Sequence, residues 1–546
     1  MQASSSRPFP YRTPPELSGG RPHDAPVVIV GAGPVGLSAA IDLALHGIAT
    51  IVLDDNDVVS VGSRAICWSK RTLEIFDRLG VGDRMIEKGV TWQVGRLFHR
   101  TREVYAFDLL PEPGHKMPAF INLQQYYVES YLVDRAMAFP DLIDLRWKNR
   151  VTNVAPRYDH AVVTVATQDG TYQLQPRFVV ACDGARSPTR SALGLDFDGQ
   201  VFEERFLIAD VKMTADFPSE RWFWFEPPFH QGQSALLHKQ PDAIYRIDLQ
   251  LGWDTDPDIE KDPDRVTERI VAMVGHRDFT LDWVSVYTFQ CRRLAQFVHG
   301  PVIFAGDSAH VVSPFGARGG NGGIQDIDNL CWKLAAVLKG VAPPNLVESY
   351  DTERGHGADE NIRNSSRSTR FMTPKSATER SFRDAVLDLA TDQPFARRLV
   401  NSGRLSQPCN LAASPLQTPS APAIGAAVAP GSACVDAPID GPGAGWMLNR
   451  LGGQFLVLTV TETQGPAKPL PLDLPELTVS CGSSPAADLA DGHRLSDPSG
   501  LVASRYGTGW HYLIRPDQHV AARVPLGAVQ ALDDAHQRAL GLTVFS

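Results

Sequence analysis

A glycine-rich segment near the N-terminus has the spacing that a phosphate-binding loop requires. The segment consists of Gly31, Ala32, Gly33, Pro34, Val35 and Gly36. An apolar run at 27–30 precedes it, and a helical pattern that stops at Gly47 follows it. In such a loop the first glycine forms the turn, the second lets a pyrophosphate approach the backbone, and the third lets the helix pack on the strand. Free amides and the partial positive charge at the helix N-terminus would hold the phosphates.

An acidic pair follows the second predicted strand, at 49–53. The pair is Asp54 and Asp55. An acid at this point of a βαβ unit accepts hydrogen bonds from the ribose of a dinucleotide. The alternative is a βαβ unit without a ligand, in which the glycines only form a turn. The complete set of strand, loop, helix, second strand and acid favours a dinucleotide site.

Two later loops also follow short apolar strands. Asp183 and Gly184 come after a predicted strand at 178–181, and Gly306 and Asp307 come after another at 302–305. A surface turn with a capping Asp is the alternative for the first of these loops. The chain has no second complete Gly-x-Gly-x-x-Gly segment, so we expect all three loops to meet one long ligand. The residues leave FAD and NAD open at this point.

The loop after Asp307 contains five glycines within the segment 316–323. A chain accepts the entropy cost of so many glycines where the backbone itself is needed. A backbone without side chains can approach a flat ring closely, and its amides can bond ring carbonyls. A flexible linker is the alternative, but linkers do not usually lie between a buried strand and an amphipathic helix.

The three motifs, in this order, resemble the flavoprotein aromatic hydroxylases, which include 4-hydroxybenzoate, 3-(3-hydroxyphenyl)propionate and phenol hydroxylases. The resemblance spans roughly 25–375, and Arg318 and Gly320 depart from the family pattern in the glycine-rich loop. It implies FAD as cofactor, NADH or NADPH as electron donor, and O2 as co-substrate. The implied activity is monooxygenation of a phenolic ring through a flavin C4a-hydroperoxide, with the cofactor supplying the redox chemistry.

The resemblance also implies roles for individual residues. Asp54 would hold the ribose, Arg64 the ADP half of FAD, and Asp307 the ribityl chain. The helix after the glycine-rich loop would point its N-terminus at the flavin N1–C2 region and stabilise the reduced flavin. The full set of implied cofactor contacts is Gly31, Gly33, Pro34, Val35, Gly36, Asp54, Asp55, Arg64, Gln125, Asp183, Gly184, Gly306, Asp307, Pro314, Gly319, Gly320, Asn321 and Gly322.

The segment 200–290 alternates apolar and polar residues, which predicts antiparallel strands. In the resembled family such a sheet covers the flavin and forms the substrate pocket. The candidates for contact with the substrate are Pro314, His238, Tyr245, Arg246 and Arg318, with Trp224 and Tyr287 as further lining residues. A core or salt-bridged role is the alternative for each sheet residue, and we expect His310 to be structural. The sequence does not identify the base that would activate the substrate.

The predicted fold class is α/β, with a Rossmann-like FAD-binding domain, an inserted antiparallel β-sheet substrate domain and a C-terminal thioredoxin-like domain. The last domain follows the resemblance to longer family members, and it lacks a Cys-x-x-Cys pair. The predicted ranges are a flexible leader at 1–24, the FAD-binding domain at 25–200 and 290–400, the substrate domain at 201–289, a linker at 401–445 and the thioredoxin-like domain at 446–546.

The composition of this 546-residue chain excludes several classes of binding partner. Its net charge of -10 argues against nucleic acid or an anionic membrane as a main partner. No apolar run reaches the ~20 residues that span a bilayer, and the leader has no apolar segment of the secretory type. The seven cysteines are scattered, which excludes the common zinc patterns and favours reduced thiols in a cytoplasm. We expect no metal and a homodimer.

Two alternative functions remain at this level. One is a tailoring monooxygenase that acts on a polycyclic or heteroaromatic compound. The other is a flavin-binding regulatory protein that has lost hydroxylation, although its cofactor loops are intact.

Overall fold

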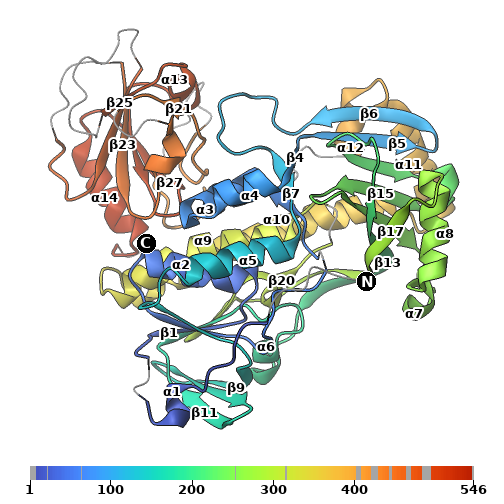
Figure 1. Cartoon of the computed structure of the whole chain (residues 1–546). Coiled ribbons are helices and arrows are strands. Elements are labelled where there is room, and N and C mark those ends of the chain that lie inside the picture. Colours follow the sequence, from blue (N-terminus) through green and yellow to red (C-terminus); the bar gives the residue numbers. More distant parts are fainter. Residues whose placement is uncertain are drawn as a thin grey trace.

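The computed structural model describes residues 8–20, 23–62, 64–252, 254–313, 316–400, 407–419, 428–441, 445–462, 469–481 and 494–543. Figure 1 shows a central block of helices with a large β-sheet on one side and the C-terminal domain on the other. A second sheet lies beneath the helical block. The cofactor motifs lie on elements of the central block and of the sheet beneath it.

The lower sheet has the strand order β18-β19-β12-β1-β2-β8. Its strands are β1 (Val27–Val30), β2 (Thr50–Leu53), β8 (Ile143–Arg146), β12 (Phe178–Ala181), β18 (Val298–His299) and β19 (Val302–Phe304). All adjacent pairs are parallel except β18 with β19. β1, β2 and β19 are buried at every residue, as expected for apolar strands covered on both faces.

Parallel pairing places the ends of the motif-bearing strands at one edge of this sheet. Val30 is in register with Leu53 and with Ala181, and Ala181 is in register with Phe304. Because the carboxyl ends of parallel strands meet at the same edge, the loops after β1, β2, β12 and β19 are neighbours. The helices of the central block are α2 (Pro34–Leu45), α3 (Lys70–Leu79), α4 (Gly82–Lys88), α5 (Gln125–Ala136), α9 (Gly319–Leu338) and α10 (Glu348–Met372).

The large sheet has the order β20-β17-β13-β16-β15-β14-β5-β6. Its strands are β5 (Val94–His99), β6 (Arg102–Asp108), β13 (Asp198–Met213), β14 (Arg221–Phe225), β15 (Ser234–Lys239), β16 (Ile244–Leu251), β17 (Phe279–Arg293) and β20 (His310–Val311). The predicted antiparallel strands are present, but the sheet extends beyond the expected range 201–289. β5, β6 and β20 join it from elsewhere in the chain, which no local alternation pattern could reveal.

The remaining elements complete the helical cover and two small sheets. The helices are α1 (Pro15–Ser18), α6 (Pro188–Ala192), α7 (Pro257–Glu260), α8 (Pro263–Val274), α11 (Ala377–Ala390) and α12 (Pro394–Val400). The strands are β3 (Cys67–Ser69), β4 (Val90–Trp92), β7 (Phe120–Asn122), β9 (Arg150–Pro156), β10 (Ala161–Thr167) and β11 (Gly170–Leu174). Strands β3-β7-β4 form a sheet, and β11-β10-β9 form another.

The C-terminal domain is built on a five-stranded mixed sheet in the order β25-β24-β23-β26-β27. Its elements are β21 (Pro438–Ile439), β22 (Gly445–Trp446), β23 (Leu456–Thr461), β24 (Glu476–Ser480), β25 (Arg494–Ser496), α13 (Leu501–Tyr506), β26 (Trp510–Ile514), β27 (Val520–Pro525) and α14 (Val529–Ala539). Its likeness to thioredoxin stays a prediction. Part of the predicted linker belongs to this domain, since Val428, Cys434 and Ile439 are buried in its core.

The described part of the predicted leader is packed rather than flexible. Phe9 stacks on Trp147 with ring centroids 4.5 Å apart, and Glu16 forms a 2.8 Å ion pair with Arg146. These contacts join 8–20 to the region around β8. They involve partners more than a hundred residues away, so the proline-rich leader sequence alone gave no sign of them.

Among the helices that the described residues form, none combines the length and the apolar character needed to cross a bilayer.

The packed N-terminal segment gives the first prediction. Phe9→Ala should release residues 8–20 and make them the first site of limited proteolysis, because it removes the stacking contact with Trp147. Burial of one aromatic side chain contributes about 1–3 kcal/mol, so the melting temperature should fall only slightly. Arg12→Ala, at an exposed neighbour, is the matched control. Equal cleavage rates in both variants and the wild type would contradict the prediction.

Candidate functional site

The three predicted loops touch one another at the edge of the parallel sheet. A β-carbon added to Gly31 would lie 2.6 Å from the carbonyl oxygen of Cys182, directly before Asp183. One added to Gly306 would lie 3.0 Å from the Val35 side chain, and one added to Gly323 would lie 3.0 Å from the Gly306 Cα. The loops after β1, β12 and β19 and the start of α9 therefore surround one site.

The first loop is closed by the acid that follows β2. Asp54 Oδ2 accepts a 2.6 Å hydrogen bond from the Ala32 amide, and its Oδ1 accepts one of 2.8 Å from the Asn56 amide. Burial raises the pKa of Asp54, although these two amide donors oppose the shift. Gly31 has a φ of 104°, a left-handed value that favours glycine. Asp55 is exposed beside this turn.

The site has open glycine positions and a buried carboxylate oxygen without a hydrogen-bond partner. No atom lies within 4 Å of a β-carbon added to Gly33 or Gly184, and the nearest to one on Gly319 is Asp307 Oδ1, at 3.9 Å. Asp183 Oδ2 accepts from the Thr189 amide at 3.0 Å, whereas its Oδ1 is buried without a hydrogen-bond partner. An open glycine turn, an orphaned carboxylate oxygen and an exposed Asp307 fit a cofactor with phosphate and hydroxyl groups.

One buried acid on α9 organises the glycine-rich loop. Asp326 Oδ2 accepts from the Gly306 amide at 3.0 Å and contacts His310 Nε2 at 2.7 Å, while its Oδ1 accepts from Arg354 Nε at 2.7 Å. Burial alone would raise the pKa of Asp326, but His310 and Arg354 lower it to about 2. His310 is buried in this network, which agrees with the structural role expected for it.

Helix α9 begins at Gly319, inside the segment 316–323 that was expected to form a glycine-rich loop. The Asn321 side chain, expected among the cofactor contacts, is instead engaged with β3. Its Oδ1 accepts from the Ser69 amide at 3.0 Å, and its Nδ2 donates to the Cys67 carbonyl at 2.9 Å. These bonds fix the first turn of α9 against β3. Gly320 and Gly322 lie in the same turn, with Gly320 close to Trp68.

The loop before β3 carries two further predicted residues. Gln125 Oε1 accepts from the Ala65 amide at 3.1 Å, and Gln125 Nε2 donates to Glu129 at 2.8 Å. Gln125 therefore holds the loop that presents Arg64. The Arg64 side chain is exposed, while its backbone carbonyl accepts a 3.2 Å bond from Arg246.

The large sheet presents a polar row toward β3. Cross-strand register places Arg221, His238, Arg246 and Asp210 side by side on one face. Arg246 Nε lies 3.3 Å from Asp210 Oδ1, and His238 Nδ1 lies 3.9 Å from Cys67 Sγ. Since β3 also anchors Asn321, this strand contacts both the polar row and the first turn of α9. His238 and Arg246 thus lie side by side, next to Arg221 and Asp210, which were not among the candidates; a substrate contact by any of them stays a prediction.

The electrostatics of the polar row distinguish its members. Burial first, and then the cations Arg221 and Arg246, place the pKa of His238 well below its ordinary value, so the imidazole is neutral at pH 7. Burial raises the pKa of Asp248, one register step away, to about 6, although Arg246 and Arg221 oppose this. Asp248 Oδ1 and Arg221 Nε are buried without hydrogen-bond partners. Arg246 and Asp248 alternate within one strand, a signal that could have identified Asp248.

Other expected substrate contacts lie elsewhere. Tyr245 packs on the opposite face of the sheet, in the cluster that includes Ile270 of α8, and its hydroxyl donates to the Ala215 carbonyl. Trp224 belongs to the same cluster. A strand alternates its side chains between two faces, so Tyr245 and Arg246 cannot both line one pocket. Tyr245 is therefore a correction to the sequence-based set.

Two further predicted residues, Arg318 and Pro314, belong to the glycine-rich loop or directly precede it. The Arg318 side chain is buried and donates to Asn361 of α10 at 3.1 Å, so at least part of its charge is directed into the protein. Pro314, predicted to face the substrate, lies outside the described residues.

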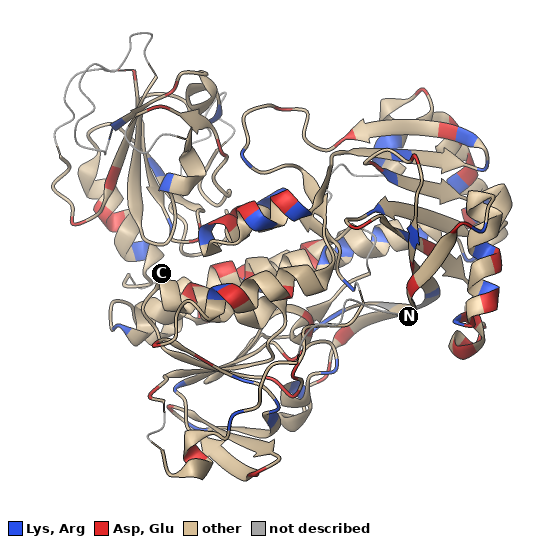
Figure 2. Cartoon of the chain, viewed as in Figure 1, with Lys and Arg blue, Asp and Glu red and all other residues tan. Residues whose placement is uncertain are grey.

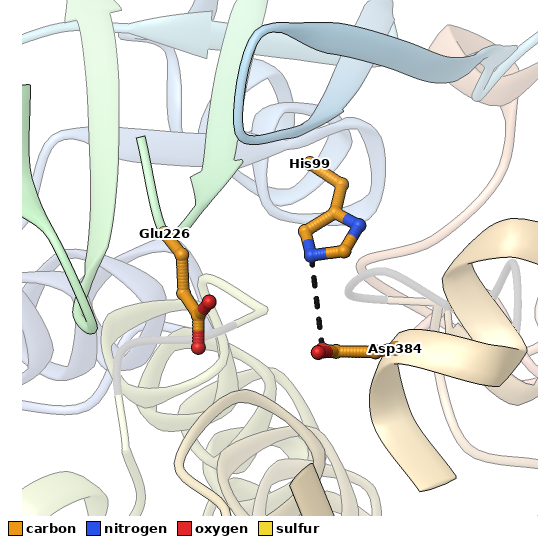
Figure 3. A group of neighbouring side chains, drawn as sticks. All are labelled: His99, Glu226 and Asp384. Atoms are coloured by element: carbon orange, nitrogen blue, oxygen red, sulfur yellow. Dashed lines mark ion pairs between the residues drawn. The ribbon is translucent and has the colours of Figure 1, made fainter. Parts of the chain in front are cut away.

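A separate group, His99, Glu226 and Asp384, brings its ligand atoms within 4.8 Å of one another (Figure 3). Arg383 donates to Glu226 at 2.6 Å and to Asp384 at 2.9 Å. Both carboxylates are therefore already neutralised by a guanidinium group, and we assign this group to structure rather than to a metal ion.

The Asp326 network predicts a pH-dependent loss of stability. Asp326→Asn should cost about 3–5 kcal/mol at pH 7, because it leaves Arg354 buried without its counter-charge. The folded-state pKa lies below the ordinary value, so the stabilisation is present above pH ~4 and fades as the pH falls toward 2. Urea unfolding of both proteins, from pH 7 to the lowest pH at which the wild type folds, measures this. A difference independent of pH would contradict it.

Substitution of two of the three glycines in the first loop should give opposite results. Gly33→Ala should fold and lose FAD affinity, because its methyl group enters open space in the phosphate turn. Gly36→Ala should instead impair folding, since a β-carbon there would lie 1.9 Å from the Gly31 carbonyl oxygen. Flavin absorbance after purification and circular dichroism report the two effects. A Gly33→Ala protein that retains full FAD would place the pyrophosphate elsewhere.

Comparison with known proteins adds an independent result. The family described as FAD binding domain matches residues 24–365. A 3-(3-hydroxy-phenyl)propionate/3-hydroxycinnamic acid hydroxylase of Mycobacterium avium is 30% identical over 390 residues, or 69% of this chain and 66% of that protein. A rifampicin monooxygenase of Streptomyces venezuelae is 31% identical, and the match covers 64% of this chain and 71% of that protein. The matched region thus spans just under two thirds of the first relative's length.

Among solved structures, the flavin-dependent monooxygenase PieE in complex with FAD and substrate has the same fold. Its TM-score is 0.76 at 21% identity, over 95% of this chain and 99% of that one. These comparisons confirm the family and the cofactor expected from the motifs. The chain belongs, through its FAD-binding domain, to the FAD-dependent aromatic hydroxylase family.

Proposed function

We propose that this protein is an FAD- and NAD(P)H-dependent monooxygenase that hydroxylates a phenolic ring with O2. The observation that carries the proposal is the polar row of Arg221, His238 and Arg246, which faces β3 and the start of α9. The sequence relatives named as hydroxylases support the reaction class. A homodimer and a cytoplasmic location stay predictions from the sequence.

The cofactor contacts follow from the site. The first loop and the start of α2 would hold the pyrophosphate, Asp54 the ribose, and Asp183 and Asp307 the polar groups farther along FAD. The amides at the start of α9 would face the flavin ring. When bound, FAD supplies the redox chemistry: it takes electrons from NADH or NADPH and activates O2.

The residues of the large sheet would bind and activate the phenol. Arg221 and Arg246 place positive charge where a phenolate forms, and neutral His238 can donate or accept one hydrogen bond. Asp248, with its pKa near 6, is the group suited to take the phenol proton near neutral pH. Deprotonation makes the ring more nucleophilic, which favours its attack on an electrophilic oxygen. Burial of this region excludes water from the reacting ring.

A second candidate is tailoring or inactivation of a larger polycyclic compound. The relative named as a rifampicin monooxygenase favours it, since that match covers more of the relative's length than the first. The same polar row would then contact one phenolic ring of the larger compound.

A substrate screen tests the proposed function. Hydroxybenzoates, hydroxyphenylpropionates, simple phenols and polycyclic phenols are compared for stimulated NADH or NADPH oxidation, with products identified by mass. We expect at least one compound to give a product heavier by one oxygen atom. Oxidation of NAD(P)H without any hydroxylated product from any compound would instead support a non-hydroxylating flavoprotein.

The role of Asp248 predicts a pH profile. Asp248 must be ionised to accept the proton, so kcat/KM should rise as the pH passes about 6. Asp248→Asn should lower kcat/KM by roughly 100-fold at pH 8 and remove this rise. Asp264→Asn, the same change at an exposed residue of α8, is the matched control. A profile that keeps its rise in Asp248→Asn would assign the ionisation to another group.

A further inference from the structure

The turn between β26 and β27 of the C-terminal domain is buried in the FAD-binding part of the chain. Arg515 and Asp517 are 0% exposed and Gln518 is 1% exposed. The local sequence, with Pro516 and Asp517 between two apolar runs, predicts only a strand-turn-strand. The side chains of Arg515 and Asp517 are instead fully buried. Figure 1 shows the C-terminal domain beside the central helices.

One set of contacts reaches α9 and α10. Arg515 donates to both carboxylate oxygens of Glu353, at 2.6 and 2.9 Å, and Lys333 of α9 donates to the same group at 2.8 Å. Asn329 of α9 donates to Glu353 at 2.6 Å and to Asp517 at 3.4 Å. Burial alone would raise the pKa of Glu353, but Arg515 and Lys333 hold it well below its ordinary value.

A second set reaches α9 through α3. Arg71 donates to the Asp517 carbonyl at 2.7 Å, to Gln518 Oε1 at 2.9 Å and to Asp328 of α9 at 2.8 Å. Figure 2 shows charges of both signs along α3, which lies beside the C-terminal domain. α3 follows β3 directly, and β3 is the strand bonded to Asn321 in the first turn of α9. The turn therefore contacts α9 directly and also through the element that fixes its N-terminal end.

Attachment of the domain does not by itself require this network. Phe455 already packs on Trp332 of α9, with ring centroids 5.5 Å apart, and the apolar core runs across the contact. The contact is not closely packed throughout, since a cavity of about 210 Å³ lies between α3 and the domain, lined in part by Arg78 and Gln518. Buried ion pairs contribute little net stability compared with apolar packing, but they require one exact arrangement of partners. The charge network thus holds α9 at one position along its own axis, whereas apolar packing alone would only keep the helix buried.

The position of α9 has its consequence at the N-terminal end of the helix. Its first turn begins at Gly319, faces Asp307 and presents the free amides of a 20-residue helix. A helix N-terminus stabilises negative charge only within its first turn, so a small displacement of the helix changes the effect. The reduced flavin carries negative charge, and its stability sets the reduction potential.

We propose that the turn Arg515–His519 is a positioning element for the cofactor, through which the C-terminal domain sets the affinity and reduction potential of FAD. Arg515 and Asp517 are positioning residues, since they act through α9 and α3 and do not touch the flavin site. The inference requires FAD binding by the family fold but does not rest on the proposed hydroxylation. Failure of the substrate screen would therefore leave it intact.

The test uses the full chain with Arg515→Met and Asp517→Asn. Three quantities are measured: the FAD dissociation constant by flavin fluorescence, the midpoint potential of the bound flavin by dye equilibration, and hydrogen exchange of amides 319–323 in the FAD-free protein. Arg515→Met should weaken FAD binding by roughly tenfold, make the potential more negative and speed exchange at 319–323. Asp517→Asn should act in the same direction with a smaller effect.

The control is Arg494→Lys, at an arginine that donates to Ser480 within the C-terminal domain. It should leave all three quantities unchanged. If Arg515→Met and Asp517→Asn lower only the unfolding midpoint, with unchanged potential and FAD affinity, the turn is a stabilising contact and the proposal is wrong. If Arg515→Met does not fold, Asp517→Asn decides between these outcomes alone.

Discussion

The structure depends on one buried constraint, the fixed position of helix α9. Asp326 on this helix bonds the Gly306 amide and pairs with His310 and Arg354 in a region closed to water. In a medium of low dielectric constant such a charge is tolerated only when every partner is in place. The Gly306–Asp307 loop, the first turn of α9 and α10 therefore hold one another in a single arrangement.

The fixed position of α9 also determines how the parallel sheet and the large sheet are placed relative to each other at the site. Asn321 joins the start of α9 to β3, and β3 in turn lies against the polar row of the large sheet. The ends of the parallel strands and one face of the large sheet thus both lie against the segment formed by β3 and the first turn of α9. In the proposed function, a substrate ring would lie between that helix end and the buried cations Arg221 and Arg246.

The C-terminal domain also holds α9 through buried polar contacts, at a distance from the site. Its buried turn shares Glu353 with Lys333 and contacts Arg71, so α9 is held near both ends by polar contacts of exact geometry. The contact between the C-terminal domain and α9 thus combines apolar packing with a buried network of charges.

The sequence by itself determined the parallel sheet and the loops at the ends of its strands, because these follow from local spacing: Gly31 to Gly36, Asp183 after one strand and Asp307 after another. That spacing left FAD and NAD open, and the family and FAD followed from the resemblance that the three motifs carry together. The sequence also predicted the antiparallel strands and placed His238 and Arg246 among the candidates. Only the tertiary structure decided that Tyr245 faces away, that Arg221 and Asp248 join the row, and that β5 and β6 complete the sheet. It alone showed that the turn at Arg515 reaches α9. The physical reason is that strand alternation fixes which residues share a face, whereas the choice of face and of distant partners depends on packing between segments far apart in the chain.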